Sequence, residues 1–227
     1  MKKFFNKAIS TYVLCIICIC FYLMECIVSK SFIINNVTLF EFGALLTPCR
    51  LSLKSKILEL PRIFFAMFVH LTPLHIISNM AFLLIIGTYI EPIFGHIRFL
   101  LIYLTSGIVG DISALCFSKP YSLIAGASTA LFGILMAGIM VPYLLHNQHL
   151  KYFSKQMFGL LIANIIIDLF TPSISLIGHL GGVCGGIIFG FLLRPKILDK
   201  KFTYLGLELL LSLLVLAIII FIYFILV

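Results

Sequence analysis

Residues 174–194 read ISLIGHLGGVCGGIIFGFLLR, an apolar run in which glycine returns at every fourth position. In a membrane, small residues at this spacing let helix backbones approach closely. The glycines that share one side of such a helix are Gly178, Gly182, Gly186 and Gly190, with Gly181 and Gly185 beside them. His179 interrupts the run, and a polar group in a bilayer needs a partner or a task. The stretch therefore predicts a tightly packed membrane helix that carries one functional histidine.

The composition of the whole chain extends this interpretation. The 227 residues are 62% hydrophobic and 11% charged, with a mean hydropathy of +1.21, whereas a soluble domain is about 45–50% apolar and about 25% charged. The predicted fold class is an all-α polytopic membrane protein. This composition excludes a disordered, fibrous or nucleic-acid-binding protein, and it leaves no room for a catalytic domain outside the membrane. Any chemistry must therefore lie within the helical bundle.

Seven apolar runs are long enough to cross a bilayer, which takes about 20 residues. We expect the first to be a retained helix and not a cleaved signal peptide, because Glu25 comes at its end and no small-residue cleavage site follows. The predicted spans are 9–28, 64–90, 97–118, 122–145, 153–171, 174–194 and 203–227.

The net charge of +8 comes from cations that lie between the apolar runs, which is typical of membrane orientation. With the N-terminus on the cytoplasmic side, ten cations fall on that side and six on the other. We therefore predict a cytoplasmic N-terminus and a C-terminus outside, in a plasma membrane. The ten predicted cytoplasmic cations are Lys2, Lys3, Lys7, Arg98, Lys151, Lys155, Arg194, Lys196, Lys200 and Lys201.

The predicted organisation has four parts. Residues 1–30 hold the N-terminal tail and first helix, and 31–63 form a long outer loop. Residues 64–195 form the transmembrane core, and 196–227 hold a seventh helix. A connection as long as 31–63 that contains Pro48, Pro61 and apolar stretches predicts a structured, partly membrane-embedded loop.

Two reactive groups fall at matching depth in this topology. Ser128, in 125–130 (AGASTA), and His179 each lie four to six residues into a span that starts at the outer face. At a rise of 1.5 Å per residue, both lie about 6–10 Å below that face. Histidine titrates in the range needed to take a serine proton, so the pair predicts a nucleophile with its base.

The second span supplies candidate donors for such a site. His75 and Asn79 are four residues apart and therefore lie on one helix face, near the depth of Ser128. Attack by a serine on a peptide carbonyl builds negative charge, which preorganised donors stabilise. A buried hydrogen-bonded pair is the alternative interpretation of these two side chains.

These motifs, taken together, resemble those of rhomboid intramembrane serine proteases over residues 40–195. His70, His75 and Asn79 fit the HxxxxHxxxN pattern, 126–128 fit the nucleophile motif, and 178–182 fit the base motif. Further matching positions in the second and third spans are Glu91, Gly95, Arg98, Tyr103, Gly107 and Gly110.

The resemblance implies a rhomboid-like bundle of six transmembrane helices plus a C-terminal seventh. It implies that Ser128 is the nucleophile and His179 the general base, as a catalytic dyad without a third acid. His75, Asn79 and the Ser128 amide would hold the oxyanion. Gly126 would permit the tight turn before the nucleophile helix, and the Phe132 ring would lie under the histidine. The loop around Arg62 would dip into the membrane.

Two residues depart from the family pattern. Thr129 stands where a glycine usually follows the serine, and Pro61 stands where a tryptophan usually precedes Arg62. Thr129 keeps open the alternative of a catalytically inactive rhomboid-like protein that binds membrane proteins without cleaving them.

Other kinds of site fit the sequence less well. Asp111 and Asp168 lie deep in spans but lack the surrounding residues of an aspartyl protease pair, so we interpret them as structural acids bonded to nearby hydroxyls. No HExxH zinc motif occurs, and neither a transporter nor a channel explains polar groups gathered near one face.

The predicted function is hydrolysis of peptide bonds in or near transmembrane segments of membrane proteins. The predicted partners are these substrate segments and the lipid bilayer, with no nucleic acid, no metal and no organic cofactor. The sequence does not determine the oligomeric state. Activity is expected to fall in acid as His179 becomes protonated.

Overall fold

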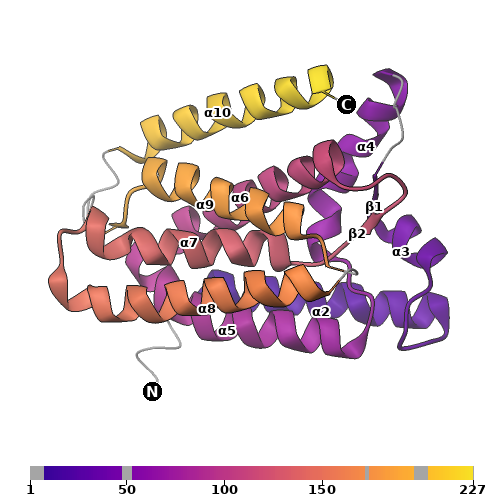
Figure 1. The fold of residues 1–227 in the computed structure, drawn as a ribbon, viewed down its shortest axis with the longest axis horizontal. Helices are drawn as coiled ribbons and strands as arrows, with labels where there is room; N and C mark the ends of the chain where they lie inside the picture. The colour runs from indigo at the N-terminus through magenta and orange to yellow at the C-terminus, as the bar shows by residue number, and fades with distance from the viewer. Residues whose placement is uncertain (1–7, 48–52, 172–173, 197–203, 227) are drawn as a thin grey trace.

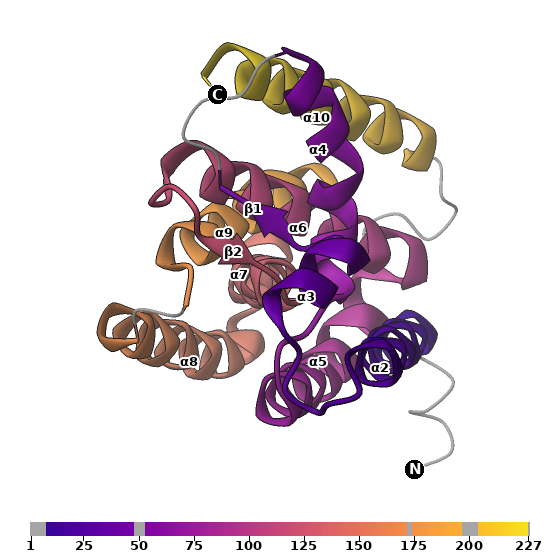
Figure 2. The same ribbon diagram turned by 90° about the vertical axis from the view of Figure 1, so that its right-hand side faces the viewer.

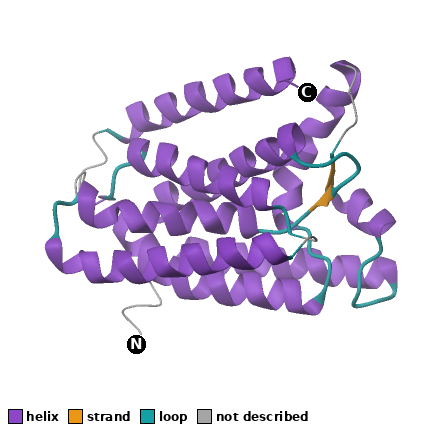
Figure 3. Cartoon of the chain, in the orientation of Figure 1, coloured by secondary structure: helices purple, strands orange, loops and turns teal. Residues whose placement is uncertain are grey.

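The structure is a computed structural model that describes residues 8–47, 53–171, 174–196 and 204–226. Long helices lie side by side along one direction, and two short strands lie at one end (Figures 1 and 3). The long helices are α2 (Ile9–Ser29), α5 (Pro73–Phe94), α6 (His96–Phe117), α7 (Ser128–Leu144), α8 (Lys151–Phe170), α9 (Leu176–Leu192) and α10 (Leu205–Leu226).

Five helices in the described part of the chain are long and apolar enough to cross a membrane, namely α2, α5, α6, α10 and α8 with its preceding turn. Helices α7 and α9 are apolar but have 17 residues each. A helix of that length spans about 26 Å, which is less than the hydrocarbon core of about 30 Å. The two helices that carry Ser128 and His179 are thus the short ones.

Helix α7 lies in the middle of the bundle, with α5, α6, α8 and α9 around it (Figure 2). The glycine side of α9 meets α7 backbone to backbone, as the sequence predicted. A Cβ added at Gly182 would lie 2.1 Å from the carbonyl oxygen of Thr129, and one at Gly186 would lie 2.3 Å from that of Gly133. Any larger residue at these two positions would push the helices apart.

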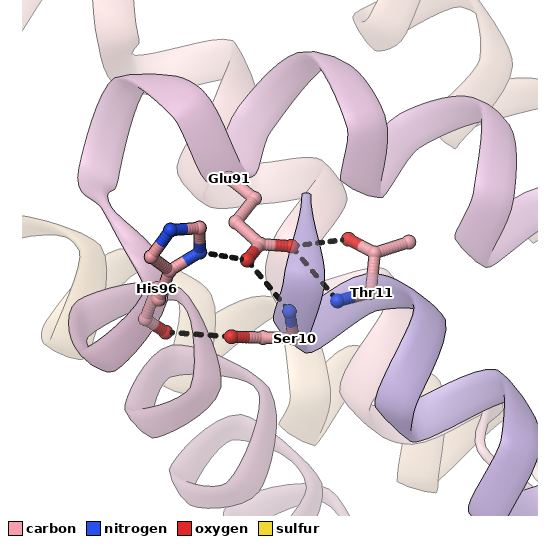
Figure 4. Close-up of polar contacts among 4 residues, drawn as sticks. All are labelled: Ser10, Thr11, Glu91 and His96. Atoms are coloured by element: carbon pink, nitrogen blue, oxygen red, sulfur yellow. Dashed lines mark hydrogen bonds and ion pairs between the residues drawn. The ribbon is translucent and has the colours of Figure 1, made fainter. Parts of the chain in front are cut away.

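Helices α2 and α5 are joined at one end of the bundle by a buried carboxylate. Glu91, near the end of α5, accepts hydrogen bonds from the backbone amides of Ser10 and Thr11 and from the Thr11 hydroxyl, at 2.7–2.8 Å (Figure 4). His96 Nδ1 lies 2.5 Å from the same carboxylate. The first amides of a helix have no partner within the helix, so Glu91 caps α2 from a neighbouring helix.

The described parts of the predicted outer loop, residues 31–47 and 53–63, contain secondary structure. They contain α3 (Asn36–Phe42), β1 (Leu45–Leu46) and most of α4 (Leu53–Phe65), which continues into the 3-10 turn η1 (Ala66–Phe68). Strand β1 pairs antiparallel with β2 (Leu123–Ile124), with Leu45 opposite Ile124. The guanidinium of Arg62 lies 3.6 Å from the centre of the Phe40 ring and donates to the carbonyls of Phe40 and Ala44. This segment therefore packs as a folded unit beside β2.

The seventh helix is tied to the core by charge. Arg98 Nε donates to Glu208 Oε2 at 2.6 Å, and both side chains are buried between α6 and α10. None of the motifs quoted for the family resemblance lies in the last segment, residues 196–227. Glu208, an acid inside an otherwise apolar run, is the residue that docks it.

Two predicted span boundaries were wrong. The span expected at 64–90 begins instead at Pro73. The Thr72 side chain caps α5 by accepting a hydrogen bond from the His75 amide, and residues 64–68 belong to the end of α4 and to η1. The span expected at 122–145 begins at Ser128, because 123–124 form β2. Pro48 and several cations used to predict orientation lie outside the described residues, namely Lys2, Lys3, Lys7, Lys200 and Lys201.

Candidate active site

Ser128 is the first residue of α7, and not one turn inside the helix as its predicted depth required. The chain reaches it through β2 and Gly126, whose amide donates to the Ala66 carbonyl at 2.8 Å. Gly126 has φ +121°, a conformation that side chains rarely adopt. A Cβ there would also lie 2.7 Å from His75 Nε2. Glycine at 126 is thus required both by the turn and by the close approach of α5.

His179 lies in the first turn of α9. Ser175 caps this helix, because its hydroxyl accepts from the Gly178 amide at 3.1 Å. His179 Nε2 lies 2.7 Å from Ser128 Oγ, so the structure brings together two residues that are 51 positions apart. His179 is 5% exposed. A hydroxyl at this distance from an imidazole nitrogen can pass its proton to that nitrogen.

A carboxylate occupies the other ring nitrogen of His179. Asp168 Oδ2 lies 2.6 Å from His179 Nδ1, and the two side chains are both buried. The interpretation of Asp168 as an acid bonded to a hydroxyl was therefore wrong, because its partner is the imidazole of His179. The signal was present in the sequence: Asp168 ends one span and His179 begins the next across a short connection. The catalytic dyad without a third acid stays a prediction.

The ring of Phe132 stacks on the imidazole of His179. The two ring centres are 4.1 Å apart, with planes tilted by 16°. Phe132 lies one turn after Ser128 on α7, so one helix supplies both the hydroxyl and the surface against which the imidazole rests. This contact, together with Asp168 and Ser128, fixes the histidine from three sides.

His75 and Asn79 lie in the first two turns of α5 and face Gly126, as the one-face spacing predicted. Asn79 Nδ2 is buried and has no hydrogen-bond partner among the described residues. The side chains of His75 and His70 lie ring to ring, with centres 5.0 Å apart. The alternative of a satisfied, hydrogen-bonded pair does not describe Asn79, whose amide donor is left over.

His70 lies in the connection between η1 and α5, outside the membrane-spanning helices. Burial, reinforced by the nearby His75 ring, lowers the pKa of His70 to about 3, against an opposing hydrogen bond to the Phe68 carbonyl. His70 is therefore neutral at physiological pH. It places a second uncharged ring behind His75.

Two cavities meet at the serine and histidine. One, of about 490 Å³, has walls formed by the first turn of α5, the segment 123–129 and the residues before α9. The other, of about 230 Å³, lies between α5, α7 and α8 and includes Asp168 and Asn79 in its wall. Side chains shared by both walls are those of His75, Ser78, Ser128, Ile174 and His179. Ser128 and His179 thus border both cavities.

The side chain of Thr129 is buried where α6, α7 and α9 pack together. Thr129 is 3% exposed, and Cβ atoms added at Gly110 or Gly178 would clash with or press on its side chain, at 2.7 Å and 3.2 Å respectively. Its side chain therefore fills the seam between α6 and α9. The glycines of two neighbouring helices provide the space that this residue needs.

The two deep acids are not paired with each other. Asp168 Oδ2 is engaged by His179, and Asp111 is buried on α6 beside Gly110. Within the residues that the structure describes, no three His, Cys, Asp or Glu side chains gather in a way that could hold a metal ion. The absence of a cofactor remains a prediction from the sequence.

Comparison with known proteins identifies the family. Residues 58–196 match the rhomboid domain. The chain is 31% identical over 169 residues to Rhomboid-like protease 3 of Toxoplasma gondii, covering 73% of this chain and 62% of that protein. It is 36% identical over 118 residues to Rhomboid protease GluP of Bacillus subtilis, covering 52% of this chain and 23% of that protein.

A plant relative is similar at the same level. RHOMBOID-like protein 1 of Arabidopsis thaliana is 34% identical over 143 residues, covering 61% of this chain and 36% of that protein. The chain thus spans less than two thirds of these relatives. It belongs to the rhomboid family and is an integral multi-pass membrane protein.

Proposed function

We propose that this rhomboid protein is an intramembrane serine endopeptidase, with Ser128 as nucleophile and His179 as general base. The observation that carries the proposal is the 2.7 Å contact between Ser128 Oγ and His179 Nε2, placed where two cavities meet. An isolated serine hydroxyl is a weak nucleophile, and a histidine in hydrogen-bond contact is what activates it. The protease names of two relatives support the same activity.

In the first half of the reaction, the Ser128 hydroxyl proton moves to His179 Nε2 as Oγ bonds to the carbonyl carbon of the substrate. The carbonyl π electrons move to the oxygen, which becomes the oxyanion. His179 then gives its proton to the departing amine, and the carbon–nitrogen bond breaks to leave an acyl-serine. Water, deprotonated by His179, attacks this ester, and the acid product leaves as Ser128 regains its proton.

The oxyanion is stabilised by His75, Asn79 and the backbone amide of Ser128. The buried, unpartnered Nδ2 of Asn79 supports this role, because a donor left without a partner inside a protein is costly unless a ligand uses it. His75 approaches Gly126 closely, two residues before the nucleophile, and so brings its ring to the same point.

The substrates are transmembrane segments that unwind locally, because a helical peptide bond is shielded by its own hydrogen bonds. Segments with glycine or proline near the cut, and a small residue before it, fit this requirement. The charge distribution favours a cytoplasmic N-terminus, which puts the site near the outer face. The membrane in which the protein acts is, in this proposal, the plasma membrane.

The test is labelling of the purified, detergent-solubilised protein with a fluorophosphonate probe, which reacts with activated serines. We expect wild type to be labelled and Ser128→Ala to be unlabelled while keeping the wild-type melting temperature. Labelling that persists in Ser128→Ala would contradict the assignment of the nucleophile.

A folded wild type that stays unlabelled, and a Thr129→Gly variant that also stays unlabelled, would favour the non-cleaving binder instead. Thr129 is the residue that keeps this second candidate open, because it departs from the family pattern beside the nucleophile.

A further inference from the structure

The side chain of Asp168 is buried near the end of α8, where its neighbours in the sequence are exposed. Asp168 is 7% exposed, whereas its neighbours Ile167, Leu169 and Phe170 are 55%, 61% and 82% exposed. Its Oδ2 lies 2.6 Å from His179 Nδ1, on the side of the ring opposite Ser128. His179 on α9 is thus hydrogen-bonded to Ser128 on α7 through one ring nitrogen and to Asp168 on α8 through the other.

We propose that Asp168 is a positioning residue that acts through His179 and makes the site a serine–histidine–aspartate triad. This inference rests on the proposed protease function. It departs from the dyad that the family resemblance implied, and it adds a residue to the reaction on the basis of the contact seen in this chain.

Asp168 has two consequences for the histidine. An ionised carboxylate only accepts hydrogen bonds, so Nδ1 must carry the proton and Nε2 must present its lone pair to Ser128. When Nε2 takes the serine proton, the ring becomes an imidazolium, and the adjacent negative charge stabilises it. No proton moves to Asp168 in this arrangement, because the carboxylate acts only as an acceptor.

Of the titratable groups near His179, Asp168 is the one placed to orient its ring. The titratable groups near His179 are His75 from α5 and Asp168 from α8, while Asp111 is buried on α6. Helix α7 presents the Ser128 hydroxyl and the apolar ring of Phe132. Of these groups, Asp168 is the one whose carboxylate contacts the imidazole directly.

A second histidine–carboxylate contact in the same chain provides a matched control. His96 Nδ1 lies 2.5 Å from Glu91 Oε1, with the same ring nitrogen facing the carboxylate (Figure 4). Glu91 also holds the start of α2, far from Ser128, so its loss disturbs a buried carboxylate contact without touching the site. Glu91→Gln therefore measures what a purely structural loss does.

The experiment compares fluorophosphonate labelling rates of wild type, Asp168→Asn and Glu91→Gln from pH 5 to pH 9, with melting temperatures measured alongside. We expect Asp168→Asn to lower the plateau rate about 100-fold, within the usual range for proton-transfer catalysis. We also expect the acid limb of its rate–pH profile to move to lower pH, because an imidazolium is less stable beside a neutral amide. Glu91→Gln keeps the wild-type rate and profile per folded molecule.

A second variant covers the case in which Asp168→Asn folds poorly. In Asp168→Ala, sodium formate supplies a small carboxylate to the vacated space beside His179, and we expect it to raise the labelling rate at least fivefold over sodium chloride at equal ionic strength. A structural role predicts no difference between the two salts.

The inference is overturned if wild type is labelled and both Asp168 variants match its labelling rate and rate–pH profile. It is also overturned if Asp168→Ala is labelled more slowly than wild type and formate raises its labelling rate no more than chloride does. An unlabelled wild type together with an unlabelled Thr129→Gly variant would overturn the proposed function itself, and this inference with it. The two failures are therefore distinguishable by whether wild type and Thr129→Gly are labelled.

Discussion

Two histidine–carboxylate contacts lie at opposite ends of the bundle, and they differ in what surrounds them. His75 and Glu91 mark the two ends of α5, about 24 Å apart at 1.5 Å per residue. At the Glu91 end, the carboxylate accepts from two backbone amides and a hydroxyl as well as from His96. At the Asp168 end, His179 is the one side-chain partner of the carboxylate among the residues that the structure describes.

The histidines differ in the same way. The side chain of His96 is 44% exposed, whereas that of His179 is 7% exposed and its second nitrogen contacts Ser128. The comparison teaches that a histidine–carboxylate contact is not by itself a catalytic feature. A catalytic role is indicated where the other ring nitrogen of the histidine contacts a nucleophile beside a cavity. A helix-capping role is indicated where the carboxylate accepts hydrogen bonds from backbone amides.

The largest expected difference between the two ends is in activity. His179→Asn is predicted to lower the fluorophosphonate labelling rate by about 1,000-fold, since general-base catalysis contributes about 10²–10⁴. His96→Asn, measured in the same preparation, should label at the wild-type rate. A similar loss in both variants would remove the functional distinction between the two ends.

The second difference is in stability. Glu91→Gln is predicted to lower the free energy of unfolding by about 2–3 kcal/mol, because an amide cannot accept from all the buried donors that the carboxylate satisfies. Asp168→Asn, with one such partner, should change it by less than about 1 kcal/mol. Reversible unfolding in mixed micelles measures both, and equal losses would show that Asp168 also holds the fold together.

The smallest expected effect concerns a third histidine, which has no carboxylate on its ring. Burial lowers the pKa of His70 to about 3, whereas an unfolded histidine titrates near 6.5. The unfolded state therefore binds the proton first, and stability is lost as the pH falls below about 6.5. Between pH 7 and pH 5.5 this residue should account for about 1 kcal/mol of lost stability.

His70→Phe should remove that part of the pH dependence, because it replaces the titrating ring by one of similar size. The measurement is the free energy of unfolding of both proteins at the two pH values. Parallel curves for wild type and His70→Phe would contradict the neutral, buried state of His70.

The local residue pattern predicted much of the fold and most residues of the candidate site. The apolar runs predicted the long helices to within a few residues, except where Thr72 and β2 delay the start of α5 and α7. The four-residue glycine spacing predicted the close α7–α9 seam. Ser128 and His179, and the shared face of His75 and Asn79, followed from residue type and spacing, since periodicity within one helix is a local property.

The sequence by itself thus determined which helices form, which helix faces carry small residues, and which polar residues need a partner. The tertiary structure decided which partner each one has: Asp168 for His179, Glu208 for Arg98, and the glycines of α6 and α9 for Thr129. These contacts depend on the rotation and depth of one helix relative to another. Those two quantities are set by packing of the whole bundle and leave no periodic trace in the segments themselves.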